Sequence, residues 1–477
     1  MLLDASPQLL THLVPISAFC FLMLFLALQT TCSMRQLKLT EFRAKLQAMA
    51  PPPSTSLQPH SSDTKINGRV FYPIGYGADP TGEQESSDAI LQALNDAFQV
   101  QSGLEMLPGV TDLGGVVIDL LGGSYKISKP IRFPASGGGN VVVLKEKASV
   151  PTGFADAKDQ NVGIYYEDIT FRDILFDSSY RGGGIFIIDS ARIRINNCFF
   201  LHFSTEGILV RKGHETFISS CFLGQHSTIG GDKGEKSFSG TAIQLSSNDN
   251  AITDAAIFSA AIGILLEGQA NIVTGVHCYN KATAFGGVGI LVKSAGALTR
   301  IDNCYLDFTA IVMEDPVQVH VTNGLFLGDA NVVLKSIRGQ ISGVNIVNNM
   351  FNGNPRNMVP IIQLDGKFNT IDQVVIDQNN VNGMNLKSTV GKLTVAGNGT
   401  KWVADFSSLL VFPDRINHFQ YSFLIQKEAA AGFPVHAVTN ASNNVVVVES
   451  DKAVNGVVSV AVDQYNYIGE SNVAFKK

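Results

Sequence analysis

Residues 185–210 read IFIIDSARIRINNCFFLHFSTEGILV, and the pattern in this stretch decides the fold. Apolar residues occupy alternate positions over three residues, and the pattern then breaks and begins again. Alternate side chains of a β-strand point to opposite faces, so each short segment predicts a strand with one buried face. The first of these segments recurs along the chain, usually after a Gly or Ala, beginning at Ile185, Ile208, Ile243, Ile264, Ile290, Ile311, Val332 and Ile362.

The spacing of these segments predicts a solenoid. Their first residues are 23, 35, 21, 26, 21, 21 and 30 positions apart, so the repeat has a floor near 21 residues with occasional insertions. A second segment, such as Ile193-Arg-Ile195, and a third, such as Cys198-Phe-Phe200, recur between them. Three short strands per repeat, joined by turns instead of helices, are typical of a β-solenoid. We therefore predict an all-β protein, a right-handed parallel β-helix with three-strand rungs of about 21 residues or more.

The flanks of the repeat divide the chain into four predicted parts. Residues 1–32 contain an apolar run at 13–28 without a preceding Lys or Arg, which predicts a signal peptide or a signal anchor. Residues 33–66 are rich in Pro and Ser and predict a flexible linker. The β-helix is expected over 67–395, with a short N-terminal helix that Ser86 can cap. A small β-rich C-terminal module is expected over 396–477, where it would cover the open end of the β-helix.

Charge and composition narrow the possible partners. The formal net charge is −6, and the chain has no basic stripe that could follow phosphates, which disfavours nucleic acid. Two N-x-S/T sequons, at Asn398 and Asn440, are consistent with a secreted glycoprotein. A membrane is a partner only if the N-terminal segment stays uncleaved, and we expect a monomer.

Four cysteines fall in the repeat. Aligning the rungs places them in one column, with Ile174, Ala256 and Leu325 at the same position elsewhere, so we expect buried thiols that act as small apolar groups. A bridge between Cys198 and Cys221 remains an alternative. Neither CxxC spacing nor clustered His accompanies the column, so we predict no metal and no cofactor. The four residues are Cys198, Cys221, Cys278 and Cys304.

Longer motifs resemble a known family. Gly-Tyr-Gly-Ala-Asp-Pro-Thr-Gly (75–82), and Gly114–Tyr125, resemble the opening of the pectate-lyase-3 group of pectin-lyase-like β-helices. Three further stretches resemble the plant quartet-type polygalacturonases: TFRDILFDSSYRGGGIF (170–186), HETFISSCFLGQHSTIGGDKGE (214–235) and YLDFTAIVMEDPVQVHVTNG (305–324). The resemblance covers roughly residues 68–477. It implies a secreted glycoside hydrolase that cleaves polygalacturonan, an acidic polysaccharide, in the cell wall.

The resemblance does not extend to the N-T-D, G-D-D, G-H-G and R-I-K motifs of other polygalacturonases. The corresponding places fall on residues 181–183, on 204–210, on Thr241 and on 265–267, and only Glu206 provides an acid within the first three of these places. Glycoside hydrolysis requires two carboxyl groups, one to protonate the leaving oxygen and one to activate water or attack the sugar. We predict Glu206 and Asp177 as this pair. A solvated turn carboxylate is the alternative for Glu206.

Further candidates flank this pair. His226 and Asp232 belong to a long insertion, 224–240, that begins one rung beyond Glu206, and long insertions on a regular solenoid are usually functional or disordered. His214 and Asp249 are predicted to share a column on adjacent rungs, as an acid/base couple or a surface ion pair. Basic side chains that can bind uronate carboxylates by hydrogen bonds are Arg181, Arg211 and Lys212.

Two other functions remain open at this point. A β-eliminating lyase of the pectate-lyase type would share the fold and the substrate. A non-catalytic pectin-binding wall protein would explain the missing motifs. Outward residues with alternating charge at the strand ends, which we expect to pair between rungs, suit any of the three functions.

Overall fold

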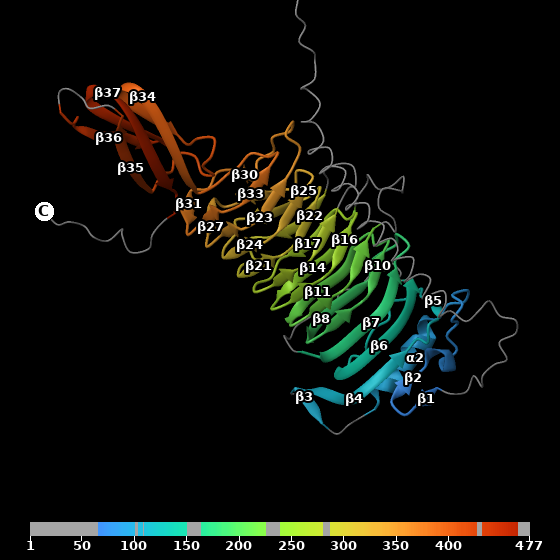
Figure 1. Cartoon of the computed structure of the whole chain (residues 1–477). Coiled ribbons are helices and arrows are strands. Elements are labelled where there is room, and N and C mark those ends of the chain that lie inside the picture. Colours follow the sequence, from blue (N-terminus) through green and yellow to red (C-terminus); the bar gives the residue numbers. More distant parts are fainter. Residues whose placement is uncertain are drawn as a thin grey trace, which may run out of the picture. The chain divides into compact units, whose positions relative to one another are not determined.

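The computed structural model describes residues 65–100, 104–107, 109–149, 164–225, 239–279, 287–426 and 432–465 (Figure 1). The predicted signal segment, the linker up to residue 64, and the candidates His226 and Asp232 lie outside these ranges. Within these ranges, no helix is long and apolar enough to cross a membrane.

The chain forms parallel strands stacked in three ladders, which confirms the predicted β-helix (Figure 1). The first ladder comprises β8 (Ile185–Ala191), β11 (Glu206–His214), β14 (Thr241–Asn248), β17 (Ile262–Leu266), β20 (Val288–Val292), β23 (Ala310–Glu314), β26 (Val332–Lys335) and β30 (Ile362–Asp365). The second comprises β9 (Arg194–Asn196), β12 (Phe217–Ser219), β15 (Ala251–Thr253), β18 (Ile272–Thr274), β21 (Thr299–Asp302), β24 (Val319–Thr322), β28 (Asn345–Val347) and β32 (Val375–Asp377). The third comprises the end of β7 (Tyr166–Asp177), then β10 (Phe199–Leu201), β13 (Phe222–Gly224), β16 (Ala256–Phe258), β19 (His277–Tyr279), β22 (Tyr305–Asp307), β25 (Leu325–Leu327), β29 (Met350–Asn352) and β33 (Asn380–Asn382).

Longer strands build the N-terminal rungs. There β4 (Val110–Asp119) pairs in parallel with β6 (Gly138–Ser149), which pairs in parallel with β7. The remaining short elements are β1 (Ile66–Asn67), β2 (Val70–Phe71), η1 (Pro73–Tyr76), α2 (Ser87–Phe98), β3 (Glu105–Leu107) and β5 (Ser124–Lys126) near the N-terminus, and the two-stranded sheet of β27 (Gln340–Ser342) and β31 (Thr370–Asp372).

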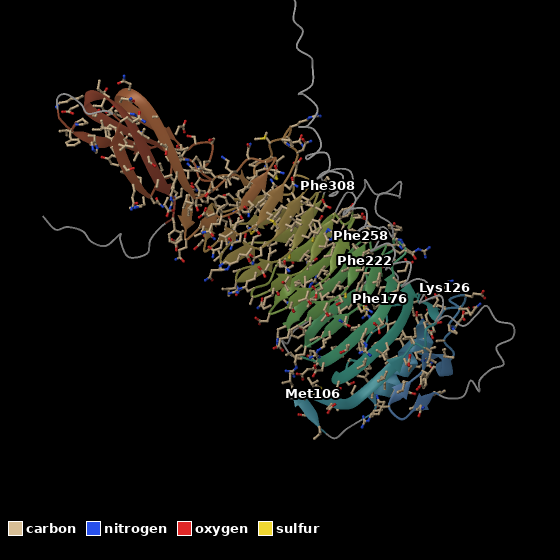
Figure 2. All side chains as sticks on the ribbon, in the orientation of Figure 1. Met106, Lys126, Phe176, Phe222, Phe258 and Phe308 are labelled. Carbon is tan, nitrogen blue, oxygen red and sulfur yellow. The ribbon has the colours of Figure 1, made fainter. Side chains whose placement is uncertain are left out.

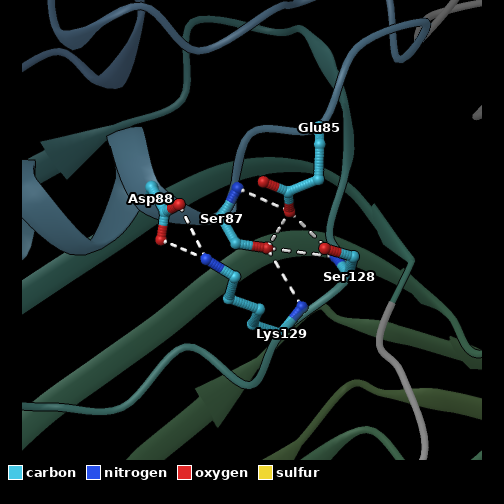
Figure 3. Close-up of polar contacts among 5 residues, drawn as sticks. All are labelled: Glu85, Ser87, Asp88, Ser128 and Lys129. Carbon is cyan, nitrogen blue, oxygen red and sulfur yellow. Dashed lines mark hydrogen bonds and ion pairs between the residues drawn. The ribbon is translucent and has the colours of Figure 1, made fainter.

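The predicted helix is α2, but its start is held differently from the prediction. The Ser86 side chain makes no cap hydrogen bond to the helix; its Oγ instead accepts from the Asp79 N–H at 2.9 Å. Around the first turn, Glu85 accepts hydrogen bonds from Ser87 and from the Ser128 N–H, and Lys129 donates to Asp88 (Figure 3). These contacts tie the helix start to the segment after β5. The apolar face of α2 is buried in the same core as the β-helix.

Side chains fill the space between the ladders (Figure 2). The Gly or Ala that precedes many first-ladder segments has a packing cause: a Cβ added at Gly184 would clash with the Phe200 ring and with the Gly207 carbonyl oxygen. Small residues thus make room for large ones on the third ladder. The column holds Gly184, Gly207, Ala242, Gly263 and Gly289.

A single residue of left-handed conformation links the second ladder to the third in most rungs. It has φ between 51° and 64° in five successive rungs, a region that Asn, Asp and Gly enter at least cost. This geometry is the physical reason for the recurring Asn of the repeat. The residues are Asn197, Ser220, Asp254, Gly275 and Asn303.

All four cysteines in the repeat are buried and free, but they do not share one column. The register of the third ladder aligns Cys198 and Cys221 with Ala255 and Val276, and then with Cys304. Cys278 instead pairs with Leu306, two positions further along the strand. The predicted column was therefore wrong for Cys278, for Ala256 and for Leu325. Both columns face inward, which is why apolar residues replace Cys in either of them.

A four-stranded antiparallel sheet follows the last rung. Its strands are β34 (Val390–Asp405), β35 (His418–Ile425), β36 (His436–Ser442) and β37 (Val445–Asp463), and β34 begins before the boundary predicted at residue 396. The sheet has its own hydrophobic cluster around the buried Trp402. The segment between β34 and β35 contacts the last rung: Arg415 donates to the Ile371 carbonyl at 2.9 Å, and Phe412 packs beside Phe368.

Candidate active site

The outward face of the first ladder has an apolar centre. Because side chains alternate along each strand, the parallel register stacks one outward residue per rung into a central column. Most members are aliphatic or aromatic, and none is ionisable. In order along the helix they are Phe186, Leu209, Gln244, Leu265, Leu291, Val312, Val333 and Gln363.

A second outward column lies two residues further along each strand, at the end nearer the second ladder. It contains charged side chains, and several of them are paired. Glu314 lies between two lysines, with Nζ of Lys293 at 3.1 Å and Nζ of Lys335 at 3.3 Å from its carboxylate oxygens. Glu267 accepts hydrogen bonds from Gln244 at 2.9 Å and from Ser246 at 2.6 Å. These contacts join neighbouring rungs, as we predicted for the alternating charges.

Asp177 and Glu206 lie at the corner turns, the segments that lead from each third-ladder strand into the next first-ladder strand. Asp177 ends β7, and Glu206 begins β11 on the next rung. The turn that follows Asp177 stacks in register on the turn that precedes Glu206. The Gly184 N–H donates to the Glu206 carbonyl at 3.0 Å, and the Tyr180 N–H donates to the His202 carbonyl at 2.8 Å. The predicted acid pair thus comes from adjacent stacked turns.

Sequence reasoning missed His202 as a partner of Asp177. Nδ1 of His202 lies 2.8 Å from Oδ1 of Asp177, and the same oxygen accepts from the Ser179 N–H at 3.0 Å. The side chain of His202 is 21% exposed and that of Asp177 is 17% exposed, so the pair is partly buried and still in contact with solvent. The ring of Tyr180, an exposed residue, lies 5.0 Å from the imidazole. A signal was present, since His202 stands four residues before Glu206.

The second predicted pair is not aligned as expected. A register shift between Arg211 and His214 places His214 opposite Asn248, so Asp249 is not its neighbour in the ladder. The Nδ1 of His214 lies 3.6 Å from Oε2 of Glu215 instead. Our prediction of a shared column for His214 and Asp249 was therefore wrong by one residue.

The three predicted uronate-binding residues occupy different settings. Arg181 is exposed on the same corner turn as Asp177. Arg211 lies over the outward Phe186, with its guanidinium carbon 5.7 Å from the ring centroid. Lys212 is exposed and has a left-handed backbone, with φ of 51°.

The base of the long insertion is held by one buried side chain. Gln225, which is 3% exposed, donates to the Phe203 carbonyl at 3.2 Å and to the Ser239 hydroxyl, and it accepts from the Ser239 N–H at 3.0 Å. The residues just before and just after segment 226–238 are thereby joined directly above the turn that carries Glu206.

Comparison with known proteins places the chain in a family. No family model matches it. Polygalacturonase QRT3 of Arabidopsis thaliana is 50% identical over 445 residues, which are 90% of this chain and 91% of that protein. The chain belongs to the quartet-type polygalacturonases.

The solved structures that resemble this polygalacturonase are distant from it in sequence. ORF18 of Geobacillus virus E2 matches 81% of the chain and 78% of its own length, with a TM-score of 0.50 and 12% identity. The endo-xylogalacturonan hydrolase of Aspergillus tubingensis matches 65% of the chain and 92% of its own length, with a TM-score of 0.48 and 10% identity. At such identities the similarity concerns the fold alone.

Within the ranges that the structure describes, no three His, Cys, Asp or Glu side chains gather as metal ligands. Acid and base groups are present, however, and hydrolysis by two carboxyl groups requires no metal.

Proposed function

We propose that this polygalacturonase is a secreted hydrolase that cleaves α-linked galacturonan outside the cell, with Glu206 and Asp177 as its acid/base pair. The observation that carries the proposal is the 50% identity, over 90% of the chain, to a protein named as a polygalacturonase. The corner turns support this choice of residues, because Asp177 ends a third-ladder strand and Glu206 begins the first-ladder strand of the next rung.

The contacts of Asp177 support the roles that we propose for the pair. Hydrogen bonds from Ser179 and His202 hold the Asp177 carboxylate in one orientation, which suits a base that takes a proton from water. Glu206 would donate a proton to the glycosidic oxygen while that water attacks the anomeric carbon and the C–O bond breaks. Rungs are about 4.8 Å apart, so adjacent-rung carboxyl groups in offset columns can reach the ~6.5–9.5 Å separation of inverting enzymes.

Binding of an acidic sugar chain would use arginines on the turn and on the first ladder. Arg181 is exposed on the turn of Asp177, and Arg211, which is half-buried, lies five residues beyond Glu206 on β11. A guanidinium binds a carboxylate by two parallel hydrogen bonds, so each can recognise one uronate. The lysines beside Glu314 are already paired and are weaker candidates.

A reducing-sugar assay on de-esterified polygalacturonate tests the proposal. We expect hydrolysis by the wild type, and Glu206→Gln and Asp177→Asn each to lower kcat by about a hundredfold or more. Asp254→Asn, on an exposed turn between the second and third ladders, is the matched control and should retain activity. Unsaturated product that absorbs ultraviolet light would identify a lyase instead. Pectin binding without turnover in any form would identify a wall-binding protein.

A further inference from the structure

Four ionisable or aromatic side chains form a compact patch on the outward face of the third ladder, away from the first-ladder residues described above. They come from β19 and β22, which pair in register, with His277 opposite Tyr305 and Tyr279 opposite Asp307. The rings of His277 and Tyr305 are stacked, with centroids 4.0 Å apart and planes 4° from parallel. The Tyr279 ring meets His277 edge-on at 5.9 Å.

Asp307 is the unusual member of this patch. Its side chain is 7% exposed, and no hydrogen bond or ion pair joins its carboxyl to any residue that the structure describes. Burial raises the pKa of Asp307 to about 6. An ionised carboxylate in such a place loses hydration without compensation, which costs free energy.

Asp315, another buried acid, does have partners. Its carboxylate accepts from the Ile337 N–H at 3.0 Å and from the Arg338 N–H at 2.6 Å. The burial of Asp315 therefore has a structural explanation that Asp307 lacks.

The fold does not require an acid at position 307. The same column begins at Asp177, five rungs away, and carries leucine on two other rungs, Leu201 and the adjacent Leu327, and Phe258 on a third. An apolar side chain thus suits the position. An outward carboxyl that is largely removed from water, at a position that apolar residues fill on other rungs, indicates a ligand.

We propose that His277, Tyr279, Tyr305 and Asp307 form a second saccharide-binding site, separate from the corner turns that carry Glu206 and Asp177. The choice of a saccharide rests on the proposed function. Aromatic side chains beside a few polar groups are typical of ligand sites, and Tyr279 and Tyr305 are half-buried on the outward side of their strands. The Asp307 carboxyl would accept hydrogen bonds from sugar hydroxyls, and these would replace its lost hydration.

Binding is measured by calorimetric titration of the full chain carrying Glu206→Gln, with release of reducing ends followed in parallel. Trigalacturonate and galactotriose are the two probes, because the hydroxyl groups can belong to an acidic or a neutral sugar chain. We expect at least one probe to bind. Asp307→Leu, which copies its column neighbours, should weaken that binding about tenfold, which corresponds to the loss of one good hydrogen bond. Tyr305→Leu, which copies Leu325 in its own column, should weaken it similarly.

Asp377→Leu is the matched control, since it replaces a carboxyl at the outward end of a second-ladder strand, and it should leave the Kd unchanged. In the chain with Glu206 intact, Asp307→Leu should hydrolyse polygalacturonate at the wild-type kcat. The proposal is overturned if neither probe binds, or if Asp307→Leu binds both as its parent does. It is also overturned if Asp307→Leu lowers kcat as strongly as Glu206→Gln, because Asp307 would then act in the chemistry. An inactive wild type that loses saccharide binding with Asp307→Leu would contradict only the proposed hydrolysis.

Discussion

Asp177 and His202 lie on consecutive rungs, 25 residues apart in sequence, and the imidazole Nδ1 of His202 lies 2.8 Å from the carboxylate Oδ1 of Asp177. A backbone hydrogen bond between the two turns holds Asp177 and His202 in this register, because the Tyr180 N–H donates to the His202 carbonyl. A protonated Nδ1 at this place donates a hydrogen bond to the carboxylate and fixes its orientation.

His202 is therefore expected to be a positioning residue for Asp177. His202→Leu removes the donor and should lower kcat by about ten- to a hundredfold with little change in KM. His202→Asn places an amide N–H near the former Nδ1 and should recover most of the activity. Steady-state kinetics on polygalacturonate separate the two parameters. Equal losses with Leu and with Asn would show that the hydrogen bond is not what matters.

The stability of the protein should depend on the ionisation of Asp307. Its pKa is raised in the folded chain to about 6 from an ordinary value of 3.8, so the folded state binds the proton more tightly than the unfolded state. Stability is then greatest below pH 4 for this group and is lost as the pH rises through 6. The loss is on the order of 2–3 kcal/mol.

Asp307→Leu removes this dependence, so the difference in unfolding free energy between variant and wild type should grow in favour of the variant between pH 4 and pH 7. Denaturant unfolding at several pH values measures it. A difference that is independent of pH would show that the Asp307 carboxyl is not desolvated.

Glu314 should stabilise the outward face of the first ladder, because its carboxylate pairs with a lysine on each of the two neighbouring rungs. Glu314→Gln leaves Lys293 and Lys335 without their shared partner, and we expect a loss of about 1 kcal/mol, because the carboxylate is 13% exposed and the lysines more so. The remaining repulsion is screened by ions, so the loss should shrink in about 1 M salt. Glu449→Gln, in the exposed pair with Lys401, is the control and should cost less than Glu314→Gln. Denaturant unfolding at two salt concentrations compares them.

The small residue at Gly184 should be essential for packing. Gly184→Ala adds a Cβ against the Phe200 ring and the Gly207 carbonyl, and overpacking of this kind costs about 1–3 kcal/mol. Ala242 occupies the same column, so Ala242→Gly serves as a matched change in the opposite direction and should cost about 1 kcal/mol, mainly through backbone entropy. Thermal unfolding reports both. Wild-type stability in Gly184→Ala would mean that Phe200 can move aside.

The rungs could be predicted from sequence because inward side chains must be apolar on every strand of a solenoid. Ile208 and Ile243 stand 35 residues apart, yet they are direct neighbours in the ladder, since the insertion between them leaves the strand pattern intact. The same rule could not place Cys278. Two inward columns run along the third ladder, both accept Cys or an aliphatic residue, and only the hydrogen-bonded register separates them.

The candidate site was predictable only in part, for a related reason. The resemblance to a family and the position of Glu206 could be read along the chain, but the partners of an outward side chain come from the next rung. His202 reaches Asp177 across such a gap, and the ring of His277 stacks on that of Tyr305 from the next rung. The misalignment of His214 with Asp249 arose from one bulge, which leaves no mark in the pattern of apolar residues.

The contacts of Gln225 mark a place where the sequence of this solenoid can change without a change in its rungs. Its amide joins both ends of the thirteen residues 226–238 and also bonds the Phe203 carbonyl of the rung below. The separation of those ends is therefore set by the scaffold and not by the segment itself. A segment of another length or composition at 226–238 is therefore expected to leave Glu206 and Thr241 paired in the ladder.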